Sequence, residues 1–288
     1  MKNAIEINHL IKKYDSKFQL GEINLKMPSG TIIGLIGENG AGKTTLIKSI
    51  LNILHIDKGS IKIFDKDYQK EENLIKEDIG VVLDDIFFPE ILNVKDIDSI
   101  MKDTYKNWDS DLYFKYLKNF EIPPNKQIKK LSKGMRKKFE IATALSHHPK
   151  LLILDEPTSG LDPVIRNEVL DIFLKFIADE EHTILLSTHI TSDLEHIADN
   201  ISLIDNGQII LEDTRDDIMD TYGILKCDID YFKNIDKKDI ISYKKNKYDY
   251  HILVKNINQI YKKYNNCIID KITLEDLMVL MIKGEKLC

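Results

Sequence analysis

Residues 31–50 read TIIGLIGENGAGKTTLIKSI and join an apolar run to a glycine-rich segment and then to a helical pattern. The segment Gly37–Thr44 fits the pattern G-x-x-x-x-G-K-[ST], in which glycines let backbone N–H groups surround a phosphate. An apolar strand before the motif and a helix after it are the context that the motif requires, and the helix N-terminus adds the positive end of its dipole. The stretch therefore predicts a phosphate loop and a nucleotide site.

Two side chains of this loop have expected roles of their own. Lys43 is expected to reach the β- and γ-phosphates, and the hydroxyl of Thr44 to complete the shell of a Mg²⁺ ion. The residues expected to hold the nucleotide at this loop are Gly37, Glu38, Asn39, Gly40, Ala41, Gly42, Lys43, Thr44 and Thr45.

Apolar runs bounded by turn residues recur around this stretch. They lie at residues 4–7, 61–64, 79–83, 151–156 and 183–188. Helical spacing separates the later runs, which predicts an α/β fold with a parallel sheet. Asn206-Gly207, between two further runs at 201–213, predicts a tight β-hairpin. Residues from about 90 to 148 have a mostly helical pattern, so a helical insertion is expected between two strands of the sheet.

A second carboxylate motif follows the strand at 151–155, where LLILDEPTSGLD covers residues 151–162. Asp155 is expected to hold Mg²⁺, directly or through a water, and Glu156 to polarise the attacking water. Adjacent acids in a turn are often only solvated charges, but an apolar strand ending in this pair beside a phosphate loop favours function.

Five motifs in order, GENGAGKTT, LSKGM, LLILDEP, SGLD and STH, resemble those of the ATP-binding subunits of ABC transporters over residues 1–215. The resemblance implies a P-loop NTPase sheet of ABC type, an N-terminal antiparallel β-subdomain and the helical insertion. It also implies ATP and Mg²⁺ as ligands, and a head-to-tail dimer with a second ATP-binding subunit, identical or paralogous. We expect residues 216–288, which follow the part that carries the resemblance, to form a small accessory α+β region. Thr273 and Asp276 indicate a capped helix there.

The resemblance also assigns roles to residues outside the loop. LSKGM would be the signature that closes over the γ-phosphate of the partner subunit, with Ser132 capping a helix that runs to His148. His189 would be the switch histidine, Asp162 would couple the two sites, and Tyr14 would stack on adenine. The signature residues are Leu131, Ser132, Lys133, Gly134 and Met135, where lysine and methionine replace the usual glycine and glutamine.

Asp84 stands where such subunits usually have a glutamine that contacts Mg²⁺, and Asp85 follows it. Two interpretations of Asp84 stay open: its carboxylate replaces the glutamine as a metal ligand, or it has no role.

The basic stretch KKLSKGMRKK at 129–138 raises the alternative of a nucleic-acid surface. The chain carries a net charge of −6 and is 43% hydrophobic and 31% charged, which argues against a chain that coats nucleic acid. We therefore expect no nucleic-acid partner and interpret the surrounding lysines as a solvated helix face.

The remaining features concern the compartment. The N-terminus MKNAIEINHLIKKY lacks the apolar core of a signal peptide, and no run of 18 apolar residues exists. Three widely spaced cysteines suggest reduced thiols. We expect a peripheral protein on the cytoplasmic face of the membrane, acting with a separately encoded permease.

The leading hypothesis is thus a transporter ATPase, with export of a drug, antibiotic or peptide inferred by analogy. One alternative is a soluble ABC-type ATPase acting on nucleic acid or the ribosome, whose usual second cassette, coiled coil or zinc hook is not apparent here. Another is a regulatory subunit that binds ATP without hydrolysing it, which the presence of Glu156 disfavours.

Overall fold

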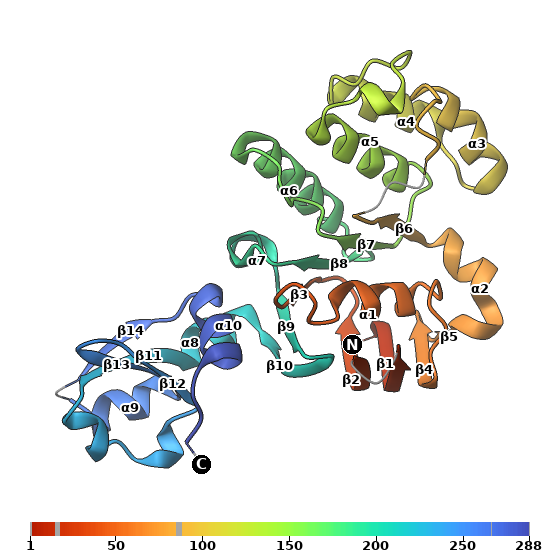
Figure 1. Ribbon diagram of the computed structural model, residues 1–288. Helices are drawn as coiled ribbons and strands as arrows, with labels where there is room; N and C mark the ends of the chain where they lie inside the picture. The colour runs from red at the N-terminus through yellow and green to blue at the C-terminus, as the bar shows by residue number, and fades with distance from the viewer. Residues whose placement is uncertain (1, 15–17, 85–87, 266, 288) are drawn as a thin grey trace.

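The computed structural model describes residues 2–14, 18–84, 88–265 and 267–287, and Figure 1 shows their arrangement. They form three sheets and the helices around them. The helices are α1 (Lys43–Ile50), α2 (Tyr68–Glu77), α3 (Asp96–Thr104), α4 (Ser110–Asn119), α5 (Lys133–Leu145), α6 (Pro163–Ile177), α7 (Thr191–Ile197), α8 (Arg215–Thr221), α9 (Ile257–Lys263) and α10 (Leu274–Lys283). Short 3-10 turns are η1 (Ile128–Lys130), η2 (Tyr231–Asn234) and η3 (Lys237–Asp239).

A six-stranded sheet in the order β10-β9-β3-β8-β7-β6 is the centre of the fold. Its strands are β3 (Ile32–Ile36), β6 (Ile79–Val82), β7 (Leu151–Asp155), β8 (Thr183–Thr188), β9 (Asn200–Asp205) and β10 (Gln208–Thr214). All neighbours pair in parallel except β9 and β10, which form the predicted hairpin. Asn206 and Gly207 both have positive φ, as the tight turn of such a hairpin requires.

An antiparallel sheet in the order β2-β1-β4-β5 contains the N-terminal segment. Its strands are β1 (Asn3–Lys13), β2 (Gln19–Pro28), β4 (Lys58–Ile63) and β5 (Lys66–Asp67). Strand β2 was not among the predicted strands, although its side chains Leu20, Ile23, Leu25 and Met27 are buried.

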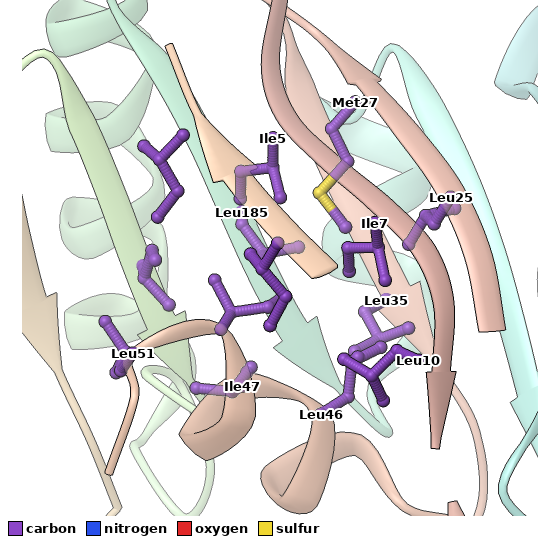
Figure 2. Close-up of a cluster of buried hydrophobic side chains, with 14 of the residues drawn as sticks. Ile5, Ile7, Leu10, Leu25, Met27, Leu35, Leu46, Ile47, Leu51 and Leu185 are labelled. Carbon is purple, nitrogen blue, oxygen red and sulfur yellow. The ribbon is translucent and has the colours of Figure 1, made fainter. Parts of the chain in front are cut away.

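The main core lies between the antiparallel sheet, α1 and the six-stranded sheet. Figure 2 shows Ile5, Ile7 and Leu10 of β1 facing side chains of α1 such as Ile47, with Leu35 of β3 close by. Each side chain of this size contributes about 1.5–3 kcal/mol when it is fully buried. This packing fixes α1, and therefore the loop in front of it, against both sheets.

The helical insertion has a core of its own, in which Tyr113, Leu117 and Phe139 are buried. The hydroxyl of Tyr113 donates to the carbonyl of Val94 at 2.8 Å, which joins α4 to the segment before α3. The helix that begins after Ser132 ends at Leu145, three residues earlier than predicted. His148 has a positive φ and precedes Pro149, which disfavours a helical conformation.

A third sheet, in the order β12-β13-β11-β14, lies in the C-terminal part of the chain, at the other end of the molecule from α3 and α4 (Figure 1). Its strands are β11 (Tyr222–Asp228), β12 (Ser242–Lys245), β13 (Asp249–Lys255) and β14 (Ile268–Lys271). Leu225, Ile252 and Ile260 are among the residues of its own core. Thr273 caps the N-terminus of α10, since its hydroxyl accepts the Asp276 N–H at 3.0 Å, as the sequence predicted.

Candidate functional site

The glycine-rich loop connects β3 directly to α1. Gly40 and Gly42 have φ of 85° and 115°, conformations that side chains rarely adopt. The turn of the β9–β10 hairpin supports the loop, because the Gly207 N–H donates to the Ala41 carbonyl at 2.8 Å. The loop therefore has a defined conformation before any ligand is considered.

Lys43, the first residue of α1, is buried at the centre of this loop. Its ammonium donates to the carbonyl of Gly37 at 2.7 Å and to that of Glu38 at 3.3 Å. It also lies 3.4 Å from the Oε1 atom of Glu156. One cation thus bridges the glycine-rich loop and the carboxylate that follows β7.

Asp155 and Glu156 follow one another at the end of β7 but have different environments. Asp155 is buried, and its carboxylate accepts the hydroxyl proton of Ser187 from the neighbouring strand β8. Glu156 has a φ of 50°, and its N–H donates to the Ser187 carbonyl at 3.1 Å. A positive φ at a non-glycine residue is uncommon and is concentrated at functional sites. Here it turns the carboxylate away from the strand and toward Lys43.

His189 comes from the end of the adjacent strand β8. Its Nδ1 atom lies 2.7 Å from Glu156 Oε2, and its backbone N–H donates to the same oxygen at 3.4 Å. Each oxygen of the Glu156 carboxylate thus faces one partner, Lys43 on one side and His189 on the other.

A cavity of about 450 Å³ opens over these groups. Its lining combines the loop with the ends of the strands: Phe18, Glu38, Asn39, Gly40, Gly42, Lys43, Thr44, Thr45, Asp84, Glu156, Ser159 and His189. A cavity of about 740 Å³ between α4, α5 and α6 is larger, but it contains none of the residues predicted for the nucleotide site. The chemistry of the lining, and not the volume, therefore identifies the candidate site.

One aromatic side chain, that of Phe18, lies at this cavity. Phe18 lines it, and a Cβ atom added to Gly42 would lie 3.3 Å from the Phe18 ring. Tyr14, predicted from the sequence to stack on adenine, is 54% exposed and is not among the lining residues. The two rings are 6.3 Å apart. Phe18 was not predicted as a site residue, and its one signal in the sequence is that it is a second aromatic residue four positions after Tyr14.

Asp84, where the sequence left two interpretations open, is exposed and lines the same cavity. Asp85 lies outside the described residues. In the part of the chain that the structure describes, no group of three or more histidine, cysteine or acidic residues forms a metal cage.

The predicted signature residues begin α5 and lie beside the loop that follows Glu156, rather than in the cavity of the same chain. Ser132 caps the helix, since its hydroxyl accepts the Met135 N–H at 3.2 Å. A Cβ atom on Gly134 would lie 3.2 Å from Ile165 of α6, so the glycine permits close packing. The side chain of Lys133 lies over Gly160. Asp162 caps α6 by accepting the N–H groups of Val164 and Ile165, both at 3.1 Å.

The lysines around the signature form only in part the solvated face that the sequence predicted, because Lys129 and Lys130 are exposed but Lys137 and Lys138 are not. Lys137 is buried. Its Nζ atom lies 3.0 Å from Glu140 Oε2 and donates to the Leu83 carbonyl. Lys138 is also buried and pairs with Glu168 of α6. Both cations connect α5 to neighbouring elements and are not available as a basic patch.

A buried polar network supports the loop after Glu156. Asp193 of α7 accepts the Thr158 hydroxyl at 2.6 Å and the Arg166 Nε–H at 2.5 Å, and only 1% of Asp193 is exposed. Because α7 follows His189 and Thr158 follows Glu156, this network connects the backbones that carry the two side chains.

Comparison with known proteins gives a consistent picture. The family model described as ABC transporter matches residues 20–159. The lantibiotic transport ATP-binding protein SrtF of Streptococcus pyogenes is 36% identical over 215 residues, which cover 74% of this chain and 91% of that protein. The bacitracin transport ATP-binding protein BcrA of Bacillus licheniformis is 32% identical over 215 residues, which cover 74% of this chain and 70% of that protein.

Solved structures resemble the same part of the chain. An ATP-binding subunit of an ABC transporter is 26% identical with a TM-score of 0.66, covering 75% of this chain and 91% of that one. A dimeric ATP-binding cassette bound to ADP and Pi is 20% identical and has the same fold, with a TM-score of 0.66. The match covers 73% of this chain and 98% of that chain. Among the described residues, no helix has the length and apolar character needed to cross a bilayer.

Proposed function

The chain belongs to the ABC transporter family as an ATP-hydrolysing, ATP-binding subunit, and from this premise we propose how its residues act and what it drives. In this proposal two subunits, identical or paralogous, enclose two ATP molecules. These subunits lie on the cytoplasmic face of the membrane, and their closure and reopening drive a separately encoded transmembrane permease. The observation that carries the proposal is the placement of Glu156 between Lys43 and His189 at the mouth of the glycine-rich loop.

Hydrolysis is assigned to these three side chains. Lys43 exchanges its contacts with the loop carbonyls for the β- and γ-phosphates, where its charge offsets that of the ligand. Glu156 accepts a hydrogen bond from the attacking water and takes its proton as the new bond to the γ-phosphorus forms, while the bond from that phosphorus to the β–γ bridging oxygen breaks and ADP leaves. His189 keeps the Glu156 carboxylate oriented and contacts the γ-phosphate. Phe18 or Tyr14 supplies the ring for the adenine.

The residues present fit a Mg²⁺ ion. Mg²⁺ in such sites keeps several waters and uses one or two carboxylates together with phosphates, so a full cage of protein ligands is not needed. The Thr44 hydroxyl, which lines the cavity, and Asp155 are the proposed ligands, with Asp84 as a further candidate. Asp155 is buried, is held by Ser187 and does not itself line the cavity, and it would hold the ion directly or through a water. When bound, the ion would neutralise charge that develops on the phosphate oxygens.

The signature of one subunit is assigned to the γ-phosphate held by the other. Leu131 and Ser132 lead into an α5 N-terminus that is capped and closely packed through Gly134, so its N–H groups are fixed in direction. Lys133 adds a cation next to this terminus. Since one chain carries both Glu156 and a signature segment, a homodimer would have two complete sites.

The permease is proposed to contact the helical insertion next to Asp84. A cavity of about 250 Å³ lies there between β6, α3 and α5, lined mainly by apolar residues that include Val81, Leu83, Phe88 and Met101. Buried Glu140 also lines this cavity, and burial raises the pKa of its carboxyl group. An apolar segment of a membrane protein is the proposed occupant of this groove.

The cargo is proposed from the relatives. Two relatives are named for the transport of bacitracin and of a lantibiotic, both of which are peptide antibiotics. A third is named for resistance to daunorubicin and doxorubicin. Export of an antibiotic or peptide is the function that these similarities support best.

Copurification with Glu156→Gln tests the proposal. This variant keeps the groups that bind ATP but loses the base, so it should accumulate in the closed, ATP-bound state. Native membranes are solubilised with Mg-ATP, and the copurifying proteins are identified. Lys43→Ala, which lacks the phosphate-binding cation, is the matched control.

A polytopic membrane protein captured by Glu156→Gln and not by Lys43→Ala is the expected result. A paralogous cassette in the same sample would identify a heterodimer. Recovery of ribosomal or nucleic-acid partners in place of a membrane protein would refute the transporter assignment.

A further inference from the structure

The glycine-rich loop carries a negative charge of its own. Glu38 is the second residue of the loop, and its side chain lines the cavity next to Lys43. A carboxylate at this position repels the phosphates of a nucleotide unless a cation offsets it. The C-terminal helix α10 supplies such a cation: Lys283 Nζ lies 2.5 Å from Glu38 Oε1.

Lys283 is held in this position by the packing of α10. Leu274, Leu277 and Leu280 are buried in the cluster that also contains Ile36, the residue directly before the loop. The Leu274 N–H donates to the Oε1 atom of Glu195 in α7 at 2.6 Å. The helix is therefore docked on the core that carries the loop. Lys283 lies three residues after Leu280 and so follows the buried leucines at the same spacing.

The C-terminal sheet holds the other side of the same helix end. The Ser242 hydroxyl of β12 donates to the Leu280 carbonyl at 2.7 Å. Directly after the helix, Glu285 and Tyr243 exchange two backbone hydrogen bonds, of 2.8 and 2.9 Å. Figure 1 shows α10 between this sheet and the six-stranded sheet. The last turn of α10 thus connects the accessory sheet to the phosphate loop.

The ion pair is partly exposed, with 62% of the Lys283 side chain and 41% of the Glu38 side chain accessible. Exposed pairs contribute little to folding stability. We therefore expect this pair to affect nucleotide affinity and not folding stability, because Lys283 offsets the charge of the Glu38 carboxylate where the phosphates bind.

We propose that Lys283 is a positioning residue of the phosphate loop, which pairs with Glu38 and makes nucleotide affinity depend on the docked C-terminal region. The proposal rests on the nucleotide-binding function of this loop. It assigns a role to residues 216–288, for which no motif was found in the sequence.

Calorimetric titration of the full chain with ADP and with ATP tests the proposal. From the charge change alone we expect roughly threefold weaker binding for Lys283→Ala and roughly tenfold weaker binding for Lys283→Glu. Lys283→Arg should stay within about twofold of the wild type, because the charge is kept. Lys286→Glu is the control, since it makes the same charge change three residues later. Among the described residues, Lys286 forms no ion pair.

Three further measurements separate this role from a structural one. The difference between Lys283→Glu and wild type should shrink at high salt, where exposed charges are screened. The same variant should raise KM for ATP and leave kcat unchanged, because uniform binding is lost. In a Glu38→Gln background, Lys283→Ala should have a smaller effect, because the loss of its own charge remains but no Glu38 carboxylate is released.

Equal affinities of wild type and Lys283→Glu would overturn the proposal, and so would an equal loss in Lys286→Glu or an undiminished effect in the Glu38→Gln background. A wild-type chain that binds neither ADP nor ATP would instead refute the nucleotide site itself, and this proposal with it.

Discussion

The Nδ1 atom of His189 lies 2.7 Å from Oε2 of Glu156, although the two residues are 33 positions apart in the chain. They meet because β7 and β8 are parallel neighbours, with Asp155 opposite Ser187, so the residues after both strands emerge at one edge of the sheet. The contact leaves Oε1 of the same carboxylate facing Lys43 at 3.4 Å.

Glu156→Gln should abolish steady-state ATP hydrolysis while nucleotide binding persists. Loss of a general base typically lowers a rate by about 10²–10⁴-fold, and the amide keeps the shape of the side chain. ATPase assays with the membrane partner and calorimetry with ADP measure the two effects. Glu181→Gln, at an exposed position outside the cavity, serves as the control. A Glu156→Gln chain that hydrolyses ATP at the wild-type rate would remove this residue from catalysis.

Lys43→Ala should weaken binding before it affects any chemical step. The ammonium is buried and donates to two loop carbonyls, so its removal deletes the cation nearest to the expected phosphates. A charged hydrogen bond contributes about 1.5–3 kcal/mol, which corresponds to roughly 10–100-fold weaker ADP binding. Lys48→Ala, in the last turn of the same helix, is the control and should bind ADP normally. Binding of ADP to Lys43→Ala with wild-type affinity would contradict the assignment.

The phosphate loop was predictable because its geometry is local. A strand, a run of glycines and a helix in immediate succession leave few conformations open, and Gly40 and Gly42 have the positive φ that the pattern requires. The strands that form the parallel sheet were predictable for a similar reason, since each is a short apolar run bounded by turn residues.

Features that depend on contacts distant in sequence were not predictable in this way. Lys137 and Lys138 have the composition of a solvated face, yet α6 and the end of β6 cover them. Phe18 and Tyr14 are both aromatic residues of one short segment, and the folded chain distinguishes them: Phe18 lies beside Gly42 and lines the cavity, and Tyr14 does not line it. The contact of Lys283 with Glu38 joins residues 245 positions apart, from 38 to 283, and no spacing rule indicates it.

Asp193→Ala should destabilise the fold as well as the site. The carboxylate is 99% buried and accepts from both Thr158 and Arg166, so its loss leaves the Arg166 guanidinium without its anionic partner and with only its bond to the Ser192 hydroxyl. Breaking a fully buried charged pair costs about 3–5 kcal/mol. Because 26% of the Arg166 side chain is exposed, we expect a loss of about 3 kcal/mol, which urea unfolding followed by circular dichroism measures. Thr158→Val removes a single hydrogen bond of the same network and should cost only about 1 kcal/mol. Similar unfolding free energies for Asp193→Ala and wild type would show that the network is not structural.

His147 should make the fold less stable in acid. The side chain is buried, its Nε2–H donates to the Ile79 carbonyl at 3.0 Å, and its ring stacks on Tyr105 at 4.0 Å. Burial lowers the pKa of this imidazole to about 4 from its ordinary 6.5. Between these two values the unfolded chain binds more protons than the folded chain, so the free energy of unfolding falls as pH falls through that window.

For a single group with these two pKa values, the loss between pH 7 and pH 5 is about 2 kcal/mol. Urea unfolding at both pH values should show that His147→Gln reduces the pH dependence by this amount. His55→Gln, which removes an exposed imidazole, should leave the dependence as it is in the wild type. If His147→Gln keeps the full pH dependence, protonation of other groups causes it, and the buried ring is not the acid-sensitive element of the helical insertion.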